Sequence, residues 1–371
     1  MQTVVSLVPY QFLPAKVGGQ RGIALFNKYF AKHVRLVCVT VKSNDASKAE
    51  GYEVRNELST SPLRYINPLN FFRLKRILKE TNASLLLIEH PYYGWLGTWL
   101  KRSTGIPLAV HSHNIEGLRF KTIGKWWWKI LWRYERFTHR QADYNFFIHD
   151  QDREFAIQAF GLQPERCITM TYGIEWSEPP ARTEMEAAGQ RLRSMHNIAS
   201  DEYILLFNGA FNYKPNLDAL KCIIQTIDPL LQQQAGFKYR IIVCGRDIPE
   251  DILNHRYQNI IVPGFVDDIN LYFRGADVFI NPVTEGGGIK TKLVEALGHN
   301  LNAVSTENGA IGVNPALCNG KLLICGNEDW EKFAANVVTA TKIRADTPPA
   351  YFKHFYWGYS VESLVRFLKL G

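Results

Sequence analysis

Short apolar runs alternate with amphipathic stretches along most of this chain. In the first half the runs are continuous, which is typical of strands covered on both faces of a sheet. They are TVVSLV, VRLVCVTV, SLLLIEH, IPLAVHSH, DYNFFIHD and CITMTYG, beginning at residues 3, 34, 84, 106, 143 and 167. Helices are predicted between them over Gly19–Ala31, Phe71–Lys79 and Lys125–Arg140. Strand, helix, strand in this order implies a parallel sheet with right-handed crossovers.

The alternation stops near residue 174 and then restarts. Residues 177–196 are polar and begin near a proline pair, which predicts an interdomain linker leading into a helix. The later runs EYILLFNG, KYRIIVCG, NIIVPGF, DVFINP, NAVST and KLLIC predict a second parallel sheet. We therefore expect an α/β protein with two doubly wound, Rossmann-like domains, 1–176 and 197–356, facing each other across a cleft. Ligands in such sheets bind at the carboxyl ends of the strands.

The composition agrees with two globular domains. The chain has 371 residues, of which 46% are hydrophobic and 21% charged, enough for two cores. The N-terminus lacks a basic segment before Pro9, and no run approaches the ~20 apolar residues that span a bilayer. These features predict a cytoplasmic protein. The six scattered cysteines predict free, buried thiols, and no cysteine–histidine cluster has metal-ligand spacing, so no metal is expected.

One glycine-rich turn carries the strongest chemical signal. The segment NPVTEGGGIKTKLVEAL (281–297) joins a predicted strand to a predicted helix. The glycines Gly286–Gly288 allow close backbone approach and positive φ, while the free N–H groups of a helix start attract anions. Lys290 and Lys292 add full charges, which suits a diphosphate, and Glu295 is placed to bind a ribose. The alternative is a tight turn in which glycine only relieves crowding; the two lysines and Glu295 favour the phosphate site.

Two further loops follow strands of the same predicted sheet. In FNGAFNYKPN the strand ends at Gly209, and Lys214 is either a phosphate ligand or a solvated lysine at a helix start. In VPGFVDD the side chain of Phe265 is expected to pack near a nucleotide base. Asp267 and Asp268 are more typical of helix N-caps than of metal ligands.

Together these motifs resemble retaining glycosyltransferases of family 4, which have the two-domain GT-B fold. VGGQRG (17–22), HSHNIE (111–116) and TYGIE (171–175) are similar to that family's first-domain motifs. The C-terminal segment 357–371 resembles its last helix, which joins the first domain. The resemblance implies transfer of a hexose-type sugar from a UDP- or GDP-sugar, without a further cofactor, to a glycan, lipid-linked or small-molecule acceptor. Cell-surface polysaccharide or glycoconjugate synthesis is the implied setting.

The resemblance also assigns roles to single residues. Arg21 is expected at the acceptor, and His113 near the donor sugar ahead of His111 and His90. The catalytic residues implied are His113, Lys290 and Glu295. The donor-binding residues implied are Gly18, Gly19, Gly209, Lys214, Phe265, Glu285, Gly286, Gly287, Gly288, Ile289, Lys290 and Glu295.

The glycine-rich turn departs from the common family pattern. Many members carry two glutamates eight positions apart, and Glu295 matches the second of them. Gly287 stands at the first position, and Glu285 lies two residues too early. The resemblance therefore points to a glycine-rich subgroup, in which backbone N–H groups and Lys290 take over the role of the first glutamate. The leaving phosphate then serves as the base, and no metal is needed.

A basic helix is predicted outside these motifs. Residues 119–140 hold seven basic residues and one glutamate, a net charge of +6. Lys125, Lys129, Arg133, Arg136 and Arg140 fall on one stripe, bordered by Trp128 and Trp132. We expect Trp127, Ile130, Leu131 and Tyr134 on the opposite, core-facing side. Such a stripe suits an anionic membrane surface, here the inner membrane face, or else a solvated face of an ordinary amphipathic helix.

Three other interpretations compete with sugar transfer. A sugar-nucleotide epimerase or a phosphorylase would use the same two-domain fold. A nucleic-acid-binding protein would explain the net charge of +8, but the charge gathers on one helix and no recognised nucleic-acid module is present. No nucleic-acid partner is therefore expected. A dehydrogenase is disfavoured because no G-x-G-x-x-G follows the first strand.

Overall fold

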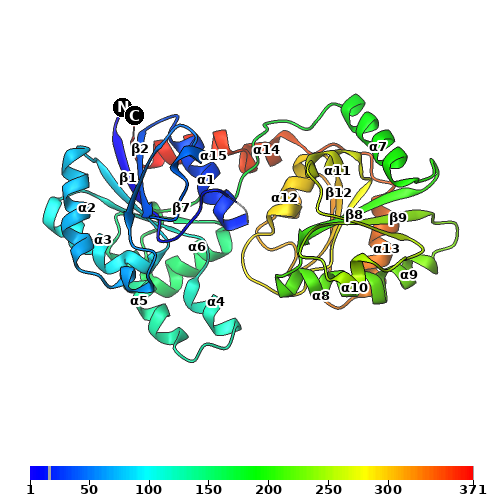
Figure 1. Cartoon of the computed structure of the whole chain (residues 1–371), viewed down its shortest axis with the longest axis horizontal. Coiled ribbons are helices and arrows are strands. Elements are labelled where there is room, and N and C mark those ends of the chain that lie inside the picture. Colours follow the sequence, from blue (N-terminus) through cyan, green and yellow to red (C-terminus); the bar gives the residue numbers. More distant parts are fainter. Residues whose placement is uncertain (16–17, 371) are drawn as a thin grey trace. The chain divides into compact units, whose positions relative to one another are not determined.

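The computed structural model describes residues 1–15 and 18–370 (Figure 1). The chain divides into two compact units. The first contains residues from Met1 to Gly173 together with the segment that begins at Trp357, and the second runs from Ile174 to Tyr356. Each unit is an α/β domain built on one parallel sheet.

The first unit has a seven-stranded parallel sheet in the order β3-β2-β1-β4-β5-β6-β7. Its strands are β1 (Thr3–Leu7), β2 (Arg35–Val41), β3 (Glu53–Leu58), β4 (Leu85–Glu89), β5 (Leu108–Ser112), β6 (Tyr144–Phe147) and β7 (Cys167–Thr169). Every residue of β1, β4 and β5 is buried, as their continuous apolar runs predict. Strand β3 is not predicted from the sequence, because this edge strand is mostly half-buried and carries charged residues among its apolar ones.

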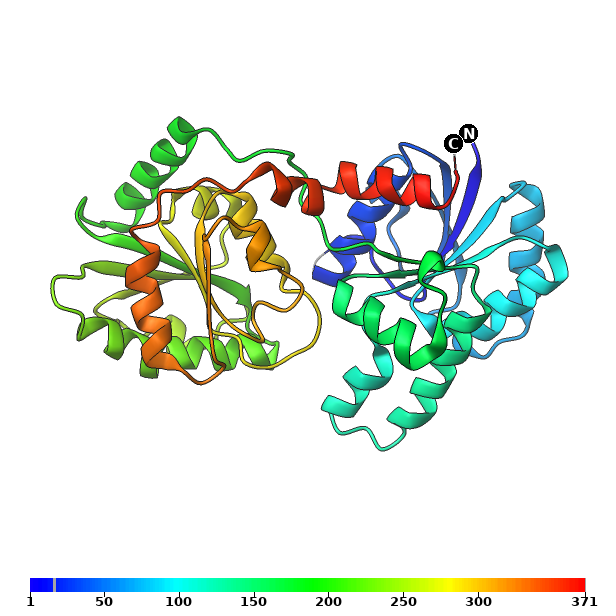
Figure 2. The same ribbon diagram turned by 180° about the vertical axis from the view of Figure 1, so that it is seen from behind.

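Helices cover both faces of the first sheet. The helices of this unit are α1 (Gly18–Phe30), α2 (Leu69–Glu80), α3 (Gly94–Thr104), α4 (Glu116–Thr122), α5 (Trp128–Gln141), α6 (Asp150–Ala156) and α15 (Trp357–Phe367). Leu74 of α2 and Leu96 of α3 are buried in one core cluster against the strands. On the other face α15 packs along α1 (Figure 2). The ring centroids of Phe26 and Trp357 lie 6.4 Å apart there. The C-terminal helix therefore does join the first domain.

Helix α5 differs from its prediction in two ways. It begins at Trp128, so Lys125 lies in the preceding segment, next to Gly124 with φ +71°. The expectation that Ile130 faces the core is wrong, since its side chain is 63% exposed. The physical reason is that α4 and the start of α5 extend away from the sheet and pack on each other, with Gly117 close to Trp132 (Figure 1).

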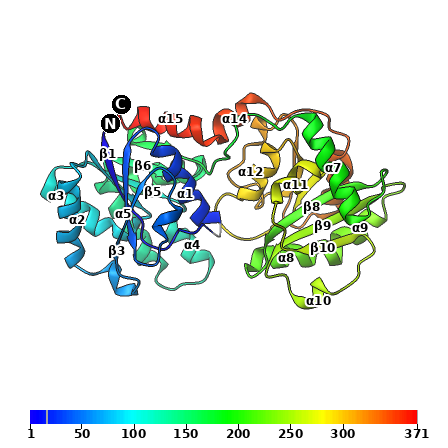
Figure 3. The same cartoon turned by 45° about the horizontal axis from the view of Figure 1, so that its top comes forward.

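The second unit has a six-stranded parallel sheet in the order β10-β9-β8-β11-β12-β13. Its strands are β8 (Tyr203–Ala210), β9 (Tyr239–Arg246), β10 (Ile260–Gly264), β11 (Val278–Asn281), β12 (Asn302–Thr306) and β13 (Leu322–Cys325). Its helices are α7 (Arg182–His196), α8 (Lys214–Cys222), α9 (Asp228–Gln232), α10 (Glu250–Leu253), α11 (Ile269–Gly275), α12 (Thr291–Gly298), α13 (Trp330–Ala340) and α14 (Pro349–Phe355). Much of segment 177–196 is helix α7, which lies beside α11 (Figure 3).

The strand order of each sheet reverses at one pair of central strands, which is the switch point of the sheet. In the first sheet the order reverses between β1 and β4, and in the second between β8 and β11. Loops that leave the carboxyl ends of such a pair diverge to opposite faces and leave a crevice where ligands bind. The glycine-rich turn, FNGAFNYKPN and the segment after β4 all lie at these ends, and the motif after β5 lies at the end of the strand next to β4.

The remaining expectations concern cysteines and membrane segments. All six cysteines are free, and all but Cys222 are buried. None of the described helices combines the length and the hydrophobicity needed to cross a membrane.

Candidate active site

The glycine-rich turn after β11 has the backbone that the sequence predicts at two of its three glycines. Gly286 has φ +91° and Gly288 has φ +71°, both in the region that favours glycine. A Cβ atom on Gly286 would lie 2.5 Å from the hydroxyl of Tyr213, so a side chain there would force Tyr213 to move. Ile289 packs against Gly312 on the far side of the turn. The turn is thus held in shape by neighbours on both sides.

Lys290 folds back onto this turn. Its Nζ donates to the carbonyl oxygens of Gly286 at 2.8 Å and of Gly288 at 3.0 Å, with Gly287 at 3.4 Å. Burial lowers the pKa of Lys290 to about 8. By engaging the carbonyls, the ammonium group fixes the turn and places a positive charge beside its N–H groups.

Lys292, in the first turn of α12, is the second cation of this region. Its Nζ donates to the carbonyl of Asn208 at 3.1 Å and to Oδ1 of Asn216 at 3.0 Å. It also lies over the ring of Phe207, 4.1 Å from the centroid. Burial, and then the charge of Lys290, lower the pKa of Lys292 to about 7. Within the described chain neither lysine has a carboxylate within ion-pair distance, so the pair lacks a counter-charge.

The loop after β8 lies beside the glycine-rich turn. Gly209 at the end of β8 leaves room for Asn216, whose side chain would be 2.9 Å from a Cβ at that position. Lys214 pairs with Asp218 at 2.5 Å and with Glu285 at 3.5 Å. Because Lys214 and Glu285 are both largely exposed, this pair is weak. The structure thus brings together two sequence-predicted residues from separate loops.

The other predicted residues of the second unit are more dispersed. Glu295 is half-buried in the second turn of α12. Phe265 is 63% exposed after β10, with the guanidinium of Arg246 5.9 Å from its ring centroid. Asp268 caps α11 by accepting from the N–H groups of Asn270 and Leu271, which confirms its predicted role.

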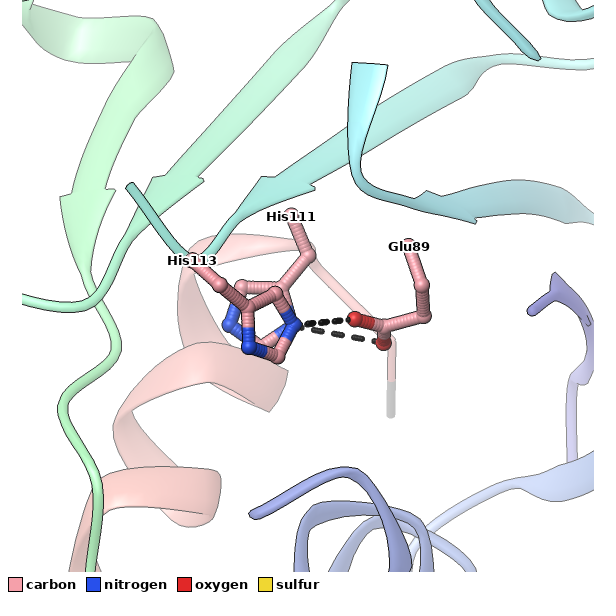
Figure 4. A group of neighbouring side chains, drawn as sticks. All are labelled: Glu89, His111 and His113. Carbon is pink, nitrogen blue, oxygen red and sulfur yellow. Dashed lines mark hydrogen bonds and ion pairs between the residues drawn. The ribbon is translucent and has the colours of Figure 1, made fainter. Parts of the chain in front are cut away.

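In the first unit, three buried or nearly buried side chains gather at the ends of β4 and β5 (Figure 4). The Glu89 carboxylate lies 2.7 Å from Nε2 of His113 and 3.0 Å from Nδ1 of His111. Glu89 is fully buried, His111 is 3% exposed and His113 is 14% exposed. His113 is therefore the member of the cluster best placed to touch a ligand.

The charges in this cluster follow from its hydrogen bonds. Burial alone would raise the pKa of Glu89, but His111 and the bonds from both imidazoles lower it well below its ordinary value. Burial, His90 and His111 lower the pKa of His113 to about 4. A neutral His113 that faces a carboxylate with Nε2 must carry its proton there, which leaves Nδ1 as an acceptor.

The cluster also has the composition of a metal site, and its distances test that possibility. Glu89, His111 and His113 each offer one ligand atom, and these atoms lie within 4.8 Å of one another. Two ligands of one tetrahedral zinc ion, each at about 2.0–2.2 Å, are separated by about 3.3 Å. The 2.7 Å between Glu89 and His113 is shorter and fits a hydrogen bond. We therefore describe the group as a hydrogen-bonded cluster.

His90, which the sequence places behind His113 as a candidate site residue, connects this cluster to its surroundings. Its ring stacks on that of His113 with centroids 4.4 Å apart, and its Nε2 lies 2.7 Å from the hydroxyl of Tyr10. Its backbone has φ +65° and ψ +156°, a region that only glycine adopts readily. Such strain is concentrated at functional sites. A histidine in the sequence gives no sign of a positive φ, so the strain at position 90 is visible only in the structure.

The predicted residues of α1 lie at the same edge of the first sheet. Helix α1 begins at Gly18, and Gly18 and Gly19 are exposed, while Val17 of the motif lies outside the described residues. Arg21 is half-buried in the first turn. Because β1 and β5 are parallel strands of one sheet, the start of α1 and His113 follow strand ends that point the same way.

Comparison with known proteins covers both units. Residues 18–175 match the model of a family described as Glycosyltransferase Family 4, and residues 202–342 match Glycosyl transferases group 1. Similar solved structures include HepE of Anabaena in complex with UDP, at 15% identity, TM-score 0.72 and full coverage of both chains. Sucrose-phosphate synthase of Thermosynechococcus elongatus has 14% identity and TM-score 0.72, with 99% of this chain and 98% of that chain covered. No curated protein sequence matches this chain.

Proposed function

We propose that this chain, which carries the two domains of a GT-B glycosyltransferase, transfers a hexose-type sugar from a UDP- or GDP-sugar to an acceptor with retention of configuration. The observation that carries the proposal is the pair Lys290 and Lys292 at the start of α12. Two partly buried cations without a nearby carboxylate are costly unless an anion completes the site. A diphosphate fits, because it can also accept hydrogen bonds from the N–H groups of the glycine-rich turn.

The fold relationship supports a nucleotide-sugar donor. The related HepE structures contain UDP in one crystal and UDP-glucose in another. We propose that loops at the carboxyl ends of β8, β10 and β11 bind the donor in this chain. We place the diphosphate at Gly286–Gly288 and Lys290, and the ribose at Glu295. Gly209 and Lys214 border the same place, and Phe265 is proposed beside the base.

The proposed sugar transfer needs no nucleophilic side chain of the protein. An oxygen of the acceptor forms a bond to the anomeric carbon while the bond from that carbon to the diphosphate breaks. The acceptor proton passes to the departing phosphate on the same face of the sugar. The main task of the protein is then to stabilise negative charge on the leaving group, through fixed N–H dipoles and the two lysines.

In the first unit, His113 is proposed as the contact to the donor sugar. With Nε2 bonded to Glu89, its Nδ1 can accept a hydrogen bond from a sugar hydroxyl. A histidine at a strand end could either donate or accept a hydrogen bond. The bond to Glu89 makes the sugar hydroxyl the donor and Nδ1 of His113 the acceptor. Gly18, Gly19 and Arg21 are proposed at the phosphate and acceptor side of the same unit.

We further propose that α5 and the segment before it bind an anionic membrane surface. Six basic side chains gather there without a carboxylate in ion-pair distance in the described part of the chain: Lys121, Lys125, Lys129, Arg133, Arg136 and Arg140. Trp126 is 83% exposed and Ile130 63% exposed beside them. Exposed apolar side chains next to unpaired cations match the interface of an anionic bilayer.

A hollow on the same helix extends this surface. It has a volume of about 580 Å³ and is lined by Arg133, Arg136, Phe137, Arg140 and Gln141. Three guanidinium groups around one hollow suit the phosphate of a lipid headgroup. A peripheral enzyme at the cytoplasmic membrane face would meet lipid-linked acceptors there.

Thermal unfolding with a panel of nucleotides tests the central proposal. UDP, GDP, ADP and their sugar conjugates are added, and one of them should stabilise the protein by ~2.7 kcal/mol at a hundred times its dissociation constant. Product analysis with the best donor then separates the reactions, because transfer yields free nucleoside diphosphate and a glycosylated acceptor, whereas epimerisation leaves the nucleotide-sugar intact. A protein that none of these nucleotides stabilises would not be a nucleotide-sugar transferase.

A further inference from the structure

An aromatic pocket opens next to the His90–His113 pair in the first unit. It has a volume of about 450 Å³ and is lined by Tyr10, Tyr65, Tyr92, Phe120 and Tyr134. These residues come from the loops after β1, β3 and β4 and from α4 and α5, so the pocket lies at the carboxyl end of the sheet. Its size is within the range of small-molecule sites. Neither the glycine-rich turn nor the membrane surface uses it.

All five lining residues are aromatic, so the wall of this pocket is mainly aromatic carbon. The hydroxyl of Tyr10 is engaged by Nε2 of His90 at 2.7 Å, and that of Tyr134 donates to the carbonyl of Tyr92 at 3.1 Å. The hydroxyl of Tyr65 accepts from Arg64 at 3.1 Å. The hydroxyl of Tyr92 is engaged by Glu116 and Arg119. With these groups occupied by the protein, a ligand meets mainly aromatic carbon, and aromatic rings attract polarised C–H groups through their electron-rich faces.

One charged pair lies beside these rings. The guanidinium of Arg119 lies 4.7 Å from the ring centroid of Phe120 and 2.7 Å from the carboxylate of Glu116. The Arg119 side chain is 38% exposed, whereas Glu116 is almost fully buried. Arg119 therefore offers N–H donors at the edge of an otherwise apolar surface. A pyranose ring has the complementary character, with apolar C–H faces and a rim of hydroxyls.

The position of the pocket links it to the proposed transfer. The ring of His90 is stacked on Tyr92 at 5.3 Å between centroids, and on His113 at 4.4 Å. One imidazole thus separates the pocket wall from the residue proposed to touch the donor sugar. An acceptor held in the pocket would be close to that sugar.

We infer that this pocket binds a saccharide ring of the acceptor by stacking on Tyr92, with the other aromatic residues as its walls and Arg119 at its hydroxyls. The inference rests on the proposed function and deepens it, because it names the acceptor as a sugar rather than an apolar chain. It also assigns acceptor recognition to residues other than Arg21.

Ligand-observed NMR by saturation transfer tests the inference. The probes are the methyl glycopyranosides of glucose, galactose and mannose, with 1-octanol as an apolar-chain probe. We expect saturation of the ring C–H protons of at least one glycoside by the wild-type protein. Tyr92→Ala should weaken that glycoside roughly tenfold, the value of one lost stacking partner of about 1.4 kcal/mol. Tyr92→Phe keeps the ring and should bind within about twofold of wild type.

The controls separate the possible failures. Tyr359→Ala removes an exposed tyrosine on α15 and should leave glycoside binding unchanged. Binding of octanol alone, or equal glycoside affinity in wild type and Tyr92→Ala, would overturn the inference. Thermal stabilisation by UDP is measured on the same samples. If UDP stabilises the protein and no glycoside binds, the pocket inference fails alone; if no nucleotide binds either, the proposed function has failed.

Discussion

The carboxylate of Glu89 lies 2.7 Å from Nε2 of His113 and fixes that ring in one orientation. Glu89 is fully buried and His113 is partly exposed, so a buried charge sets the tautomer of a side chain that can meet a ligand. With its pKa lowered to about 4, His113 is neutral at pH 7. Its Nδ1 atom is therefore the one that can accept a hydrogen bond from a ligand.

Replacement of Glu89 by glutamine tests this relationship. The amide of Glu89→Gln can donate as well as accept, so His113 is no longer bound to one tautomer. We expect turnover to fall at least about tenfold, as when a histidine loses the carboxylate that orients it. Nitrogen NMR of the His113 ring should show the proton moving from Nε2 toward Nδ1. Unchanged nitrogen shifts together with unchanged turnover would rule out a positioning role; Glu50→Gln, on the surface, is the matched control.

Two substitutions of His90 separate its backbone from its ring. Both His90→Ala and His90→Gly remove the stack on His113, but only glycine adopts φ +65° without strain. We expect the glycine variant to be more stable than the alanine variant by about 1–2 kcal/mol. Chemical unfolding of the two proteins measures the difference. An alanine variant as stable as the glycine variant would show that the backbone at this position carries no strain.

Lys290 is expected to be essential for turnover. Lys290→Ala removes a charge and three contacts to turn carbonyls, so turnover at saturating donor should fall about 10²–10³-fold. The melting temperature should change little, because the turn is at the surface of the unit. Lys332→Ala, a lysine substitution on α13, serves as the control. Wild-type turnover in the Lys290 variant would remove this residue from the mechanism.

Lys292 predicts a pH dependence of nucleotide binding. A bound diphosphate favours the ammonium form, so binding above pH 7 must take up a proton at a group whose pKa is about 7. The affinity for UDP should therefore fall as the pH rises from 7 to 9. Calorimetry in two buffers of different ionisation enthalpy measures the proton uptake directly. Lys292→Arg stays charged and should lose this dependence; an unaltered pH profile in that variant would assign the effect to another group.

Lys292 also predicts a pH dependence of folding stability in the protein without a ligand. In the unfolded chain its pKa is the ordinary 10.5, so between pH 7 and 10.5 the unfolded state binds more protons. Folding stability from this group therefore rises with pH across that window. Lys292→Met should accordingly raise the melting temperature more at pH 6 than at pH 9. An equal gain at both pH values would contradict a lowered pKa.

Charge reversal on α5 tests the membrane surface. Lys129→Glu with Arg133→Glu should abolish most co-sedimentation with anionic vesicles, since each basic residue near such a surface contributes ~1 kcal/mol. Lys75→Glu with Lys79→Glu on α2 changes the net charge equally and should retain binding. If wild-type protein sediments equally with neutral and anionic vesicles, attraction to lipid charge is excluded.

Sequence reasoning found the fold because buried parallel strands leave a strong trace. The central strands β1, β4 and β8 appear as continuous apolar runs, whereas the edge strand β3 carries Glu53, Arg55 and Glu57 and was missed. The glycine-rich turn was likewise visible, since its positive φ angles require glycine. Ile130 was misplaced because helical periodicity shows which residues share a face, but not whether another element covers that face.

Contacts between distant segments were beyond the reach of the sequence. Glu89 looked like the end of an apolar strand, and only the sheet order brings it to His113, 24 positions later. Lys292 could be recognised as a cation near a phosphate site, but its position over Phe207 depends on the packing of α12 against β8. The aromatic pocket could not be predicted from the sequence either, since its five residues come from separate loops and helices.

The return of α15 to the first unit has a consequence for how the protein is made. The first unit needs Trp357 against Phe26, yet residues 174–356 are synthesised between these two partners. During translation the second unit can complete its sheet before α15 has been synthesised and can pack along α1. The first domain is thus finished last, although its strands emerge first, and until then its apolar α1 surface is open to chaperones or to aggregation.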